Sequence, residues 1–144
     1  SKMGLIQARM MGEFLKKIEI PIGQIITSPS CRARQTSELL FGSVGKIDNL
    51  LLHPGPYNEK LVDFRKSIKN LILNLETENG KNSIISAHNG VIKREIFDRV
   101  NKDINFNLEE GGFYVMKKIN KELVLIDKFH NFNYFNQILF SRPK

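Results

Sequence analysis

Two short stretches of the sequence carry residue types suited to phosphate chemistry. Residues 28–36 read Ser-Pro-Ser-Cys-Arg-Ala-Arg-Gln-Thr, and residues 87–90 read Ala-His-Asn-Gly. The guanidinium of Arg32 presents planar paired donors that match phosphate oxygens, and Arg34 can add charge from nearby. The imidazole of His88 is suited to proton transfer or phosphoryl chemistry near neutral pH.

Each stretch follows a segment that we predict to be a β-strand. Residues 24–27 form a short β-prone run, and residues 83–87 are almost wholly apolar, as in a strand covered on both faces. Arg32 is therefore predicted at the start of a helix just past a strand end, where free backbone N–H groups and the helix dipole favour an anion. Asn89 and Gly90 supply a turn whose backbone donors can also face an anion.

The remaining periodicities complete an alternation of strands and helices. Apolar residues recur every three or four positions in two helices, one through Met3, Ile6, Met10, Phe14 and Ile18, and the other through Leu61, Phe64, Ile68, Leu71 and Leu75. We also predict helices over 31–41 and 91–100, a short strand over 47–52, and a hairpin that pairs 113–119 with 122–129. This order predicts an α/β fold built on a mostly parallel sheet with helices on both faces, with ligands outside the carboxyl ends of the strands.

Composition narrows the class of protein. A chain of 144 residues, 41% hydrophobic and 26% charged, is typical of one soluble globular domain, here residues 1–144. The single cysteine, Cys31, cannot build a disulfide framework or a zinc cluster. No apolar run approaches the roughly 18 residues of a membrane span and no secretory signal opens the chain, so we expect a cytoplasmic protein with no membrane partner. The net charge of +7 is the sole support for a nucleic-acid-binding domain.

These residues also resemble motifs of the histidine phosphatase superfamily, which includes the phosphoglycerate mutases. Gly4, Gln7 and Ala8 are similar to the family's Gly-x-x-Gln-Ala pattern. Residues 28–36 are similar to its Ser-Pro-x-x-Arg-Ala-x-Gln-Thr run, and residues 86–90 to the motif around its second histidine. The resemblance runs from residue 1 to about Phe129 in the family's order. It implies a phosphoglycerate mutase-like fold and a phosphatase that uses neither metal nor cofactor.

The resemblance implies phosphoryl transfer through a covalent phosphohistidine. In this family an arginine-rich pocket holds the phosphate, one histidine attacks phosphorus in line, a second stabilises the equatorial oxygens, and water releases the phosphate. Carried over, Arg32 and Asn89 bind the substrate phosphate and His88 is the second histidine. The expected substrate is a phosphomonoester or a phosphorylated protein side chain. Positioned cations suit this reaction because its transition state spreads charge over the phosphoryl oxygens.

One part of the family pattern is not in the chain. The family's nucleophile lies in an Arg-His-Gly motif ahead of the Gly-x-x-Gln-Ala helix, and we expect that motif, with the sheet's first strand, in a segment upstream of Ser1. The alternative is a non-catalytic phosphate-binding remnant of the same fold. The proton donor is also open. Glu59 and His53 stand nearest to the family's acid, and Glu109 or Glu110 can approach from another strand.

Overall fold

The computed structural model describes residues 2–52, 61–100 and 103–131, which form three helices and two small β-sheets. The elements in chain order are α1 (Lys2–Lys17), β1 (Ile22–Thr27), α2 (Cys31–Phe41), β2 (Lys46–Ile47), α3 (Leu61–Leu73), β3 (Asn82–Ser86), β4 (Arg99–Val100), β5 (Phe113–Ile119) and β6 (Glu122–Phe129). Short 3-10 turns cover Asn49–Leu51 and Arg94–Ile96. The α/β class predicted from the sequence is confirmed.

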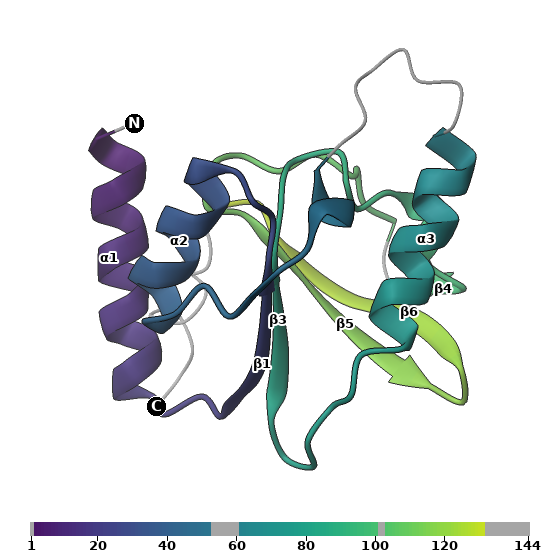
Figure 1. The fold of residues 1–144 in the computed structure, drawn as a ribbon, viewed down its shortest axis with the longest axis horizontal. Helices are drawn as coiled ribbons and strands as arrows, with labels where there is room; N and C mark the ends of the chain where they lie inside the picture. The colour runs from purple at the N-terminus through teal and green to yellow at the C-terminus, as the bar shows by residue number, and fades with distance from the viewer. Residues whose placement is uncertain (1, 53–60, 101–102, 132–144) are drawn as a thin grey trace.

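The first sheet is parallel, with strand order β2-β1-β3. Thr27, the last residue of the central strand β1, is level with Ile47 of β2 and with Ser86 of β3. In Figure 1, α1 and α2 lie on one side of this sheet and α3 lies on the other. The carboxyl ends of β1 and β3 therefore meet at one edge, as the alternation of strands and helices predicts.

The second sheet is mixed, with strand order β4-β6-β5. Strands β5 and β6 form the predicted hairpin, and its two-residue turn places Asn120 at φ 50° and Lys121 at φ 66°. Among the described strands, none joins β3 to the second sheet. The strands thus fall into two sheets, where the sequence predicts one mostly parallel sheet.

One hydrophobic core connects the two sheets. It contains side chains from β1, from α3, from β6 and from the segment between β3 and β4, and its buried members are Ile26, Leu51, Ile68, Ile72, Val91, Ile96, Phe97, Leu123 and Leu125. Helices α1 and α2 pack on each other through a smaller cluster centred on Ala8 and Met11. Because the main core draws on both sheets, each sheet covers apolar surface of the other.

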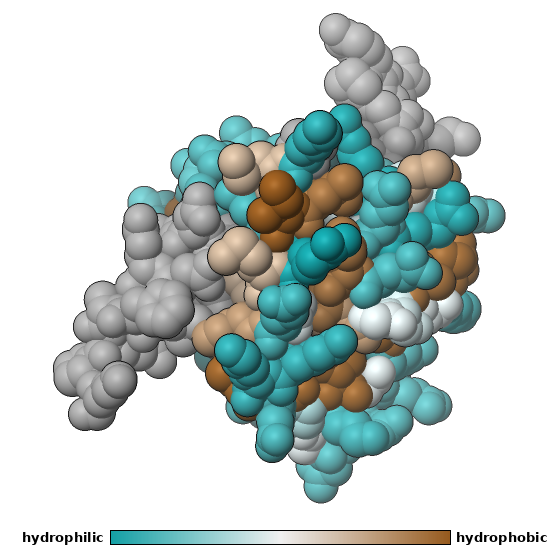
Figure 2. Space-filling view, turned by 90° about the vertical axis from the view of Figure 1, so that its left-hand side faces the viewer, coloured by the Kyte–Doolittle hydropathy of each residue, from teal (hydrophilic) through white to brown (hydrophobic). Residues whose placement is uncertain are grey.

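Most of the apolar stripe predicted for α1 points outward, although its member Phe14 packs against the buried Ala8 and Met11. Met3, Ile6 and Met10 are 63%, 54% and 58% exposed. The buried face turns to α2 and includes Ala8, Met11 and Gly12. Figure 2 shows the apolar surface on this side of the molecule, between polar side chains. Small residues decide the orientation, because a Cβ at Gly12 would collide with the Leu39 carbonyl of α2.

The prediction of a helix over residues 91–100 is wrong. Val91, Ile96 and Phe97 are buried in the main core, but the chain reaches them through turns. The segment then ends in strand β4, in which Arg99 and Val100 pair with β6. Asp98, Arg99 and Val100 thus pair with β6 instead of making the internal hydrogen bonds of a helix. The strand predicted over 47–52 is also shorter in the structure, because a 3-10 turn follows Ile47.

Candidate active site

The two stretches selected from the sequence meet at the carboxyl edge of the first sheet. Strands β1 and β3 are parallel neighbours, and their last residues, Thr27 and Ser86, are level. Immediately past the strand end, the backbone N–H of Ser28 donates to the Ser86 carbonyl at 2.8 Å. Pairing therefore continues into the first residue of the loop that leads to α2.

A side-chain contact also joins the two stretches. The hydroxyl oxygen of Ser28 lies 2.8 Å from Nε2 of His88, a residue 60 positions later in the chain. Ser28 is fully buried and His88 is partly buried. This hydrogen bond holds the imidazole at the strand ends, and its serine partner is shielded from water.

The first turn of α2 is fixed over the same edge. Ser30 caps the helix by accepting a hydrogen bond from the Ala33 backbone N–H at 3.2 Å, the arrangement preferred at a helix start. The hydroxyl of Ser86 at the end of β3 donates to the Ala33 carbonyl at 3.1 Å. Arg32, the neighbour of Ala33, therefore belongs to a turn bonded directly to the strand that leads to His88.

The charges in this turn are unusual for a helix start. The first turn of α2 contains no acidic residue and carries Arg32 and Arg34, both exposed. Within the described parts of the chain, the side chain of Arg32 makes no hydrogen bond or ion pair, while Arg34 Nη2 donates to Cys31 Sγ at 3.6 Å. Because the helix dipole places partial positive charge at this same end, cations here are uncompensated and an anion would be stabilised.

Buried hydroxyl groups join the elements that lie beneath the candidate site. Thr27 donates to the Val44 carbonyl at 2.7 Å, and Ser37 of α2 donates to the Ser43 carbonyl at 2.7 Å. Both side chains are fully buried. These bonds connect the end of β1, the middle of α2 and the loop that leads to β2. The position of α2 over the sheet is consequently determined by polar contacts as well as by packing.

The side chain of Asn89 holds the loop after β4. Its Nδ2 donates to Asn107 Oδ1 at 3.2 Å, and its Oδ1 accepts from the Leu108 backbone N–H at 3.4 Å. The amide thus connects the turn after β3 to the segment before β5. A contact between Asn89 and a substrate phosphate stays a prediction.

The candidate proton donors differ in their surroundings. The carboxylate of Glu109 accepts from Asn131 at 2.8 Å and lies 3.0 Å from His130 Nε2. The hydrogen bonds from Asn131 and His130, in that order, lower the pKa of Glu109, so this side chain is ionised near neutral pH and is a poor acid.

Glu110 points elsewhere. Its carboxylate lies against Gly4 in the first turn of α1, where a Cβ would overlap it and where the helix dipole favours negative charge. Glu59 and His53 lie outside the described residues.

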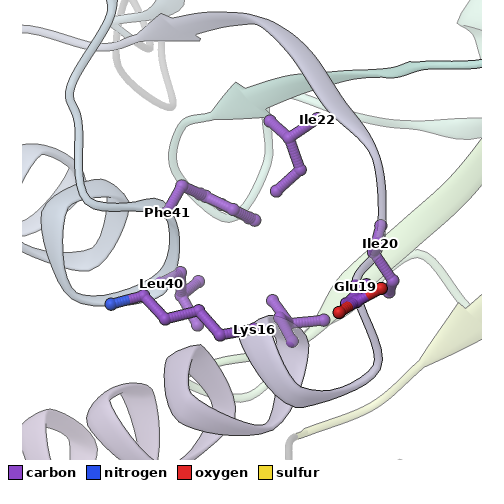
Figure 3. Close-up of a pocket in the computed structure, with 7 residues that line it drawn as sticks. Lys16, Glu19, Ile20, Ile22, Leu40 and Phe41 are labelled. Atoms are coloured by element: carbon purple, nitrogen blue, oxygen red, sulfur yellow. The ribbon is translucent and has the colours of Figure 1, made fainter.

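A pocket lies at the opposite end of β1 (Figure 3). It measures about 340 Å³, and it is formed where α1 and α2 end and β1 begins, by Leu15, Lys16, Glu19, Ile20, Ile22, Leu40 and Phe41. The length of β1, about 17 Å for five residue steps, separates Ile22 in this pocket from Thr27 beside the site. The pocket is therefore not part of the candidate site.

The described residues contain no cluster of His, Cys, Asp and Glu that could hold a metal ion. No helix in the described ranges is long and apolar enough to cross a membrane. Comparisons with protein family models, with curated proteins and with solved structures find no match.

Sequence reasoning selected Arg32 and His88 and missed Ser28 and Ser86 as residues of the site. Ser28 and Ser86 have ordinary side chains, and their importance arises from partners 60 and 53 positions away in the chain. The available signal was position, because both serines occur where an apolar strand ends.

Proposed function

We propose that this chain binds a phosphoryl group at the carboxyl edge of the first sheet. We propose further that it provides the phosphate-binding part of a metal-independent phosphatase of the histidine phosphatase type. The observation that carries the proposal is the convergence of His88, through Ser28, with the helix start that presents Arg32. An imidazole, a guanidinium and the positive end of a helix dipole are groups that suit the binding of phosphoryl oxygens.

Each of these groups has a distinct task in the proposed reaction. Arg32 and the first turn of α2 bind phosphoryl oxygens and neutralise the charge that the transition state spreads over them. His88 donates to an equatorial oxygen. The attacking histidine comes from the Arg-His-Gly segment that the resemblance implies, forms an N–P bond as the bond from phosphorus to the leaving oxygen breaks, and gives up the phosphate to water.

The first sheet has an edge at which such a segment can pair. Strand β3 bonds to β1 on one side, and among the described strands it has no partner on the other. An added strand parallel to β3 would end beside His88, because the carboxyl end of β3 leads directly to it. The first sheet would then have a fourth strand and would be more like the single, mostly parallel sheet that the sequence predicts.

Phosphate binding tests the site in the chain as it stands. We expect inorganic phosphate to shift the backbone amide NMR signals of the α2 start and of residues 86–90. Arg32→Ala should weaken the affinity about tenfold, the effect of losing a charge-assisted contact. Arg9→Ala, which removes the same charge from the exposed side of α1, is the matched control. Equal losses in the two variants would reduce the interaction to general attraction by net charge and would refute the site.

Activity tests the chemistry. A protein that joins this chain to the Arg-His-Gly segment implied by the resemblance should hydrolyse an aryl phosphate in the presence of EDTA, and His88→Ala should reduce its kcat at least about a hundredfold. Phosphate binding without hydrolysis in the extended protein would instead support the non-catalytic phosphate-binding module. Hydrolysis that EDTA abolishes would contradict the metal-independent mechanism.

A further inference from the structure

The sequence contains two Asn-Gly dipeptides, and both form the same kind of turn. Each turn closes through a backbone hydrogen bond, from the Lys81 N–H to the Glu78 carbonyl at 3.0 Å and from the Val91 N–H to the His88 carbonyl at 3.2 Å. The two glycines have φ 78° and 96°, and neither asparagine has a positive φ, as in a type II turn. The two turns therefore differ in their surroundings and not in their backbone.

Asn-Gly is the dipeptide from which a side-chain amide is most easily lost, because glycine has no Cβ to shield its backbone nitrogen. That nitrogen attacks the side-chain carbonyl carbon of the asparagine. A C–N bond forms, the bond from the carbon to the amide nitrogen breaks, and the amide leaves as ammonia with the proton of the attacking nitrogen. Water then opens the resulting succinimide at either carbonyl and leaves an aspartyl or an isoaspartyl residue. Contacts that hold the asparagine side chain away from the next nitrogen slow this reaction.

In the first turn, no contact restrains the asparagine. Asn79 and Gly80 are exposed, and a Cβ at Gly80 would meet nothing within 4 Å. Within the residues that the structure describes, the Asn79 side chain and the Gly80 N–H make no hydrogen bond. The ion pair between Lys81 and Glu78, at 2.7 Å, does not involve the amide. The Asn79 side chain can therefore rotate onto the Gly80 nitrogen without breaking a bond.

In the second turn, the asparagine is held at both ends of its amide. Nδ2 of Asn89 donates to Asn107 Oδ1 at 3.2 Å, and Oδ1 of Asn89 accepts from the Leu108 backbone N–H at 3.4 Å. Both partners belong to the segment that leads to β5, so they draw the amide away from its own backbone. The Asn89 side chain must lose both hydrogen bonds before its carbonyl carbon can reach the Gly90 nitrogen.

We propose that Asn79 is a site of spontaneous deamidation in the folded protein, and that Asn107 and Leu108 protect Asn89 from the same reaction. Loss of the Asn79 amide creates a carboxylate ahead of the amino end of β3. The same change at Asn89 would add negative charge past the carboxyl end of β3, in the turn that follows His88. Neither reaction requires a bound phosphoryl group, so the outcome is independent of the proposed function.

Peptide mapping of the folded protein after incubation at mildly alkaline pH measures both rates. Trypsin places the two asparagines in separate peptides, residues 70–81 and 82–93, and mass spectrometry detects the replacement of an amide by a carboxyl. We expect Asn79 to react at least about tenfold faster than Asn89, because two hydrogen bonds restrain Asn89. The same peptides incubated after digestion should react at similar rates. Equal rates in the folded protein, an unreactive Asn79, or a difference that persists in the peptides would overturn the proposal.

Two variants identify the source of the protection. Asn107→Ala removes one of the two hydrogen bonds and should speed the reaction of Asn89 about fivefold, with the rate at Asn79 unchanged. Lys128→Met is the matched control, because Lys128 Nζ donates to the carbonyl and to Oδ1 of Asn105 in the same segment, at 2.9 Å and 2.8 Å. It should leave both rates unchanged. Equal acceleration at Asn89 in the two variants would assign the effect to loosening of the segment and overturn the role of Asn107.

Discussion

Asp98 joins a helix to the second sheet through a single carboxylate. Lys69 of α3 donates to its Oδ1 at 2.7 Å, and the Leu123 backbone N–H of β6 donates to its Oδ2 at 2.7 Å. Its own backbone N–H donates to the Leu123 carbonyl at 2.8 Å. The hydrogen bond from Lys69, followed by that from Leu123, lowers the pKa of Asp98 below its ordinary 3.8.

Asp98→Asn tests this link through the pH dependence of stability. Because the folded pKa lies below 3.8, the ionised carboxylate stabilises the fold above that value and loses its effect as the pH falls through the folded pKa. At pH 7 we expect the variant to be less stable by about 1 kcal/mol, in keeping with a partly exposed group. The difference should shrink below about pH 4.

Urea unfolding at neutral and acid pH measures both values. The control is Asp103→Asn, which removes an exposed carboxylate and should leave the free energy of unfolding nearly unchanged. A deficit in Asp98→Asn that is constant with pH would contradict the role of the ionised group.

Single residues also show what the sequence can and cannot reveal about a site. Arg32 and His88 could be selected because their side chains have few alternatives for binding and transferring phosphoryl groups. Ser28 could not, because a serine hydroxyl acquires its role from the neighbour that folding supplies, in this case a histidine 60 positions away.

At the scale of elements, α1 shows why periodicity alone does not choose a buried face. The helix carries apolar residues around much of its circumference, so the spacing of Met3, Ile6 and Met10 is genuine but does not mark the packed side. The packed side is the one where Gly12 and Ala8 let the backbone of α2 approach closely. Backbone proximity is a property of two helices together, and the sequence of one helix does not contain it.

Two neighbouring methionines test the orientation of α1. Met11 is 3% exposed and Met10 is 58% exposed, in the same turn of the same helix. Met11→Ala should lower the free energy of unfolding by about 2–4 kcal/mol, because it opens a cavity against α2. Met10→Ala should change it by less than about 0.5 kcal/mol. Chemical denaturation of both variants measures the contrast, and a larger loss from Met10→Ala would mean that the outward face is covered.

At the scale of the whole molecule, the two sheets depend on one core. Ile26 from the first sheet and Leu125 from the second are buried in the same cluster, with Ile68 of α3. A residue removed from either sheet therefore exposes apolar surface that the other sheet helps to cover. Sheets that share a core in this way are expected to unfold together.

A single cooperative transition is the resulting prediction. Far-ultraviolet circular dichroism and amide NMR intensities from each sheet should report one midpoint in urea. Leu125→Ala should lower that midpoint for both sheets, including the resonances of β1 and β3, with a loss of about 2–4 kcal/mol. Two separated transitions, or a loss confined to the second sheet, would show that the sheets fold independently.

The division into two sheets also marks the limit of sequence reasoning at this scale. Alternating strands and helices predicted the α/β class, parallel strands and a candidate site outside the carboxyl ends of those strands. They could not predict that residues 91–100 would add strand β4 to β6, because that pairing involves residues about 25 positions apart with no local signal. Long-range pairing decides where a sheet ends.

The reversal between β5 and β6 has a consequence for how the chain assembles. Both turn residues have positive φ, and the second is Lys121, a residue whose Cβ is crowded in this conformation. Asn-Gly is the dipeptide that favours this turn, and Lys121 stands here in place of the glycine. The hairpin therefore depends on its paired strands and on the burial of Leu123 and Leu125 to hold this turn in place.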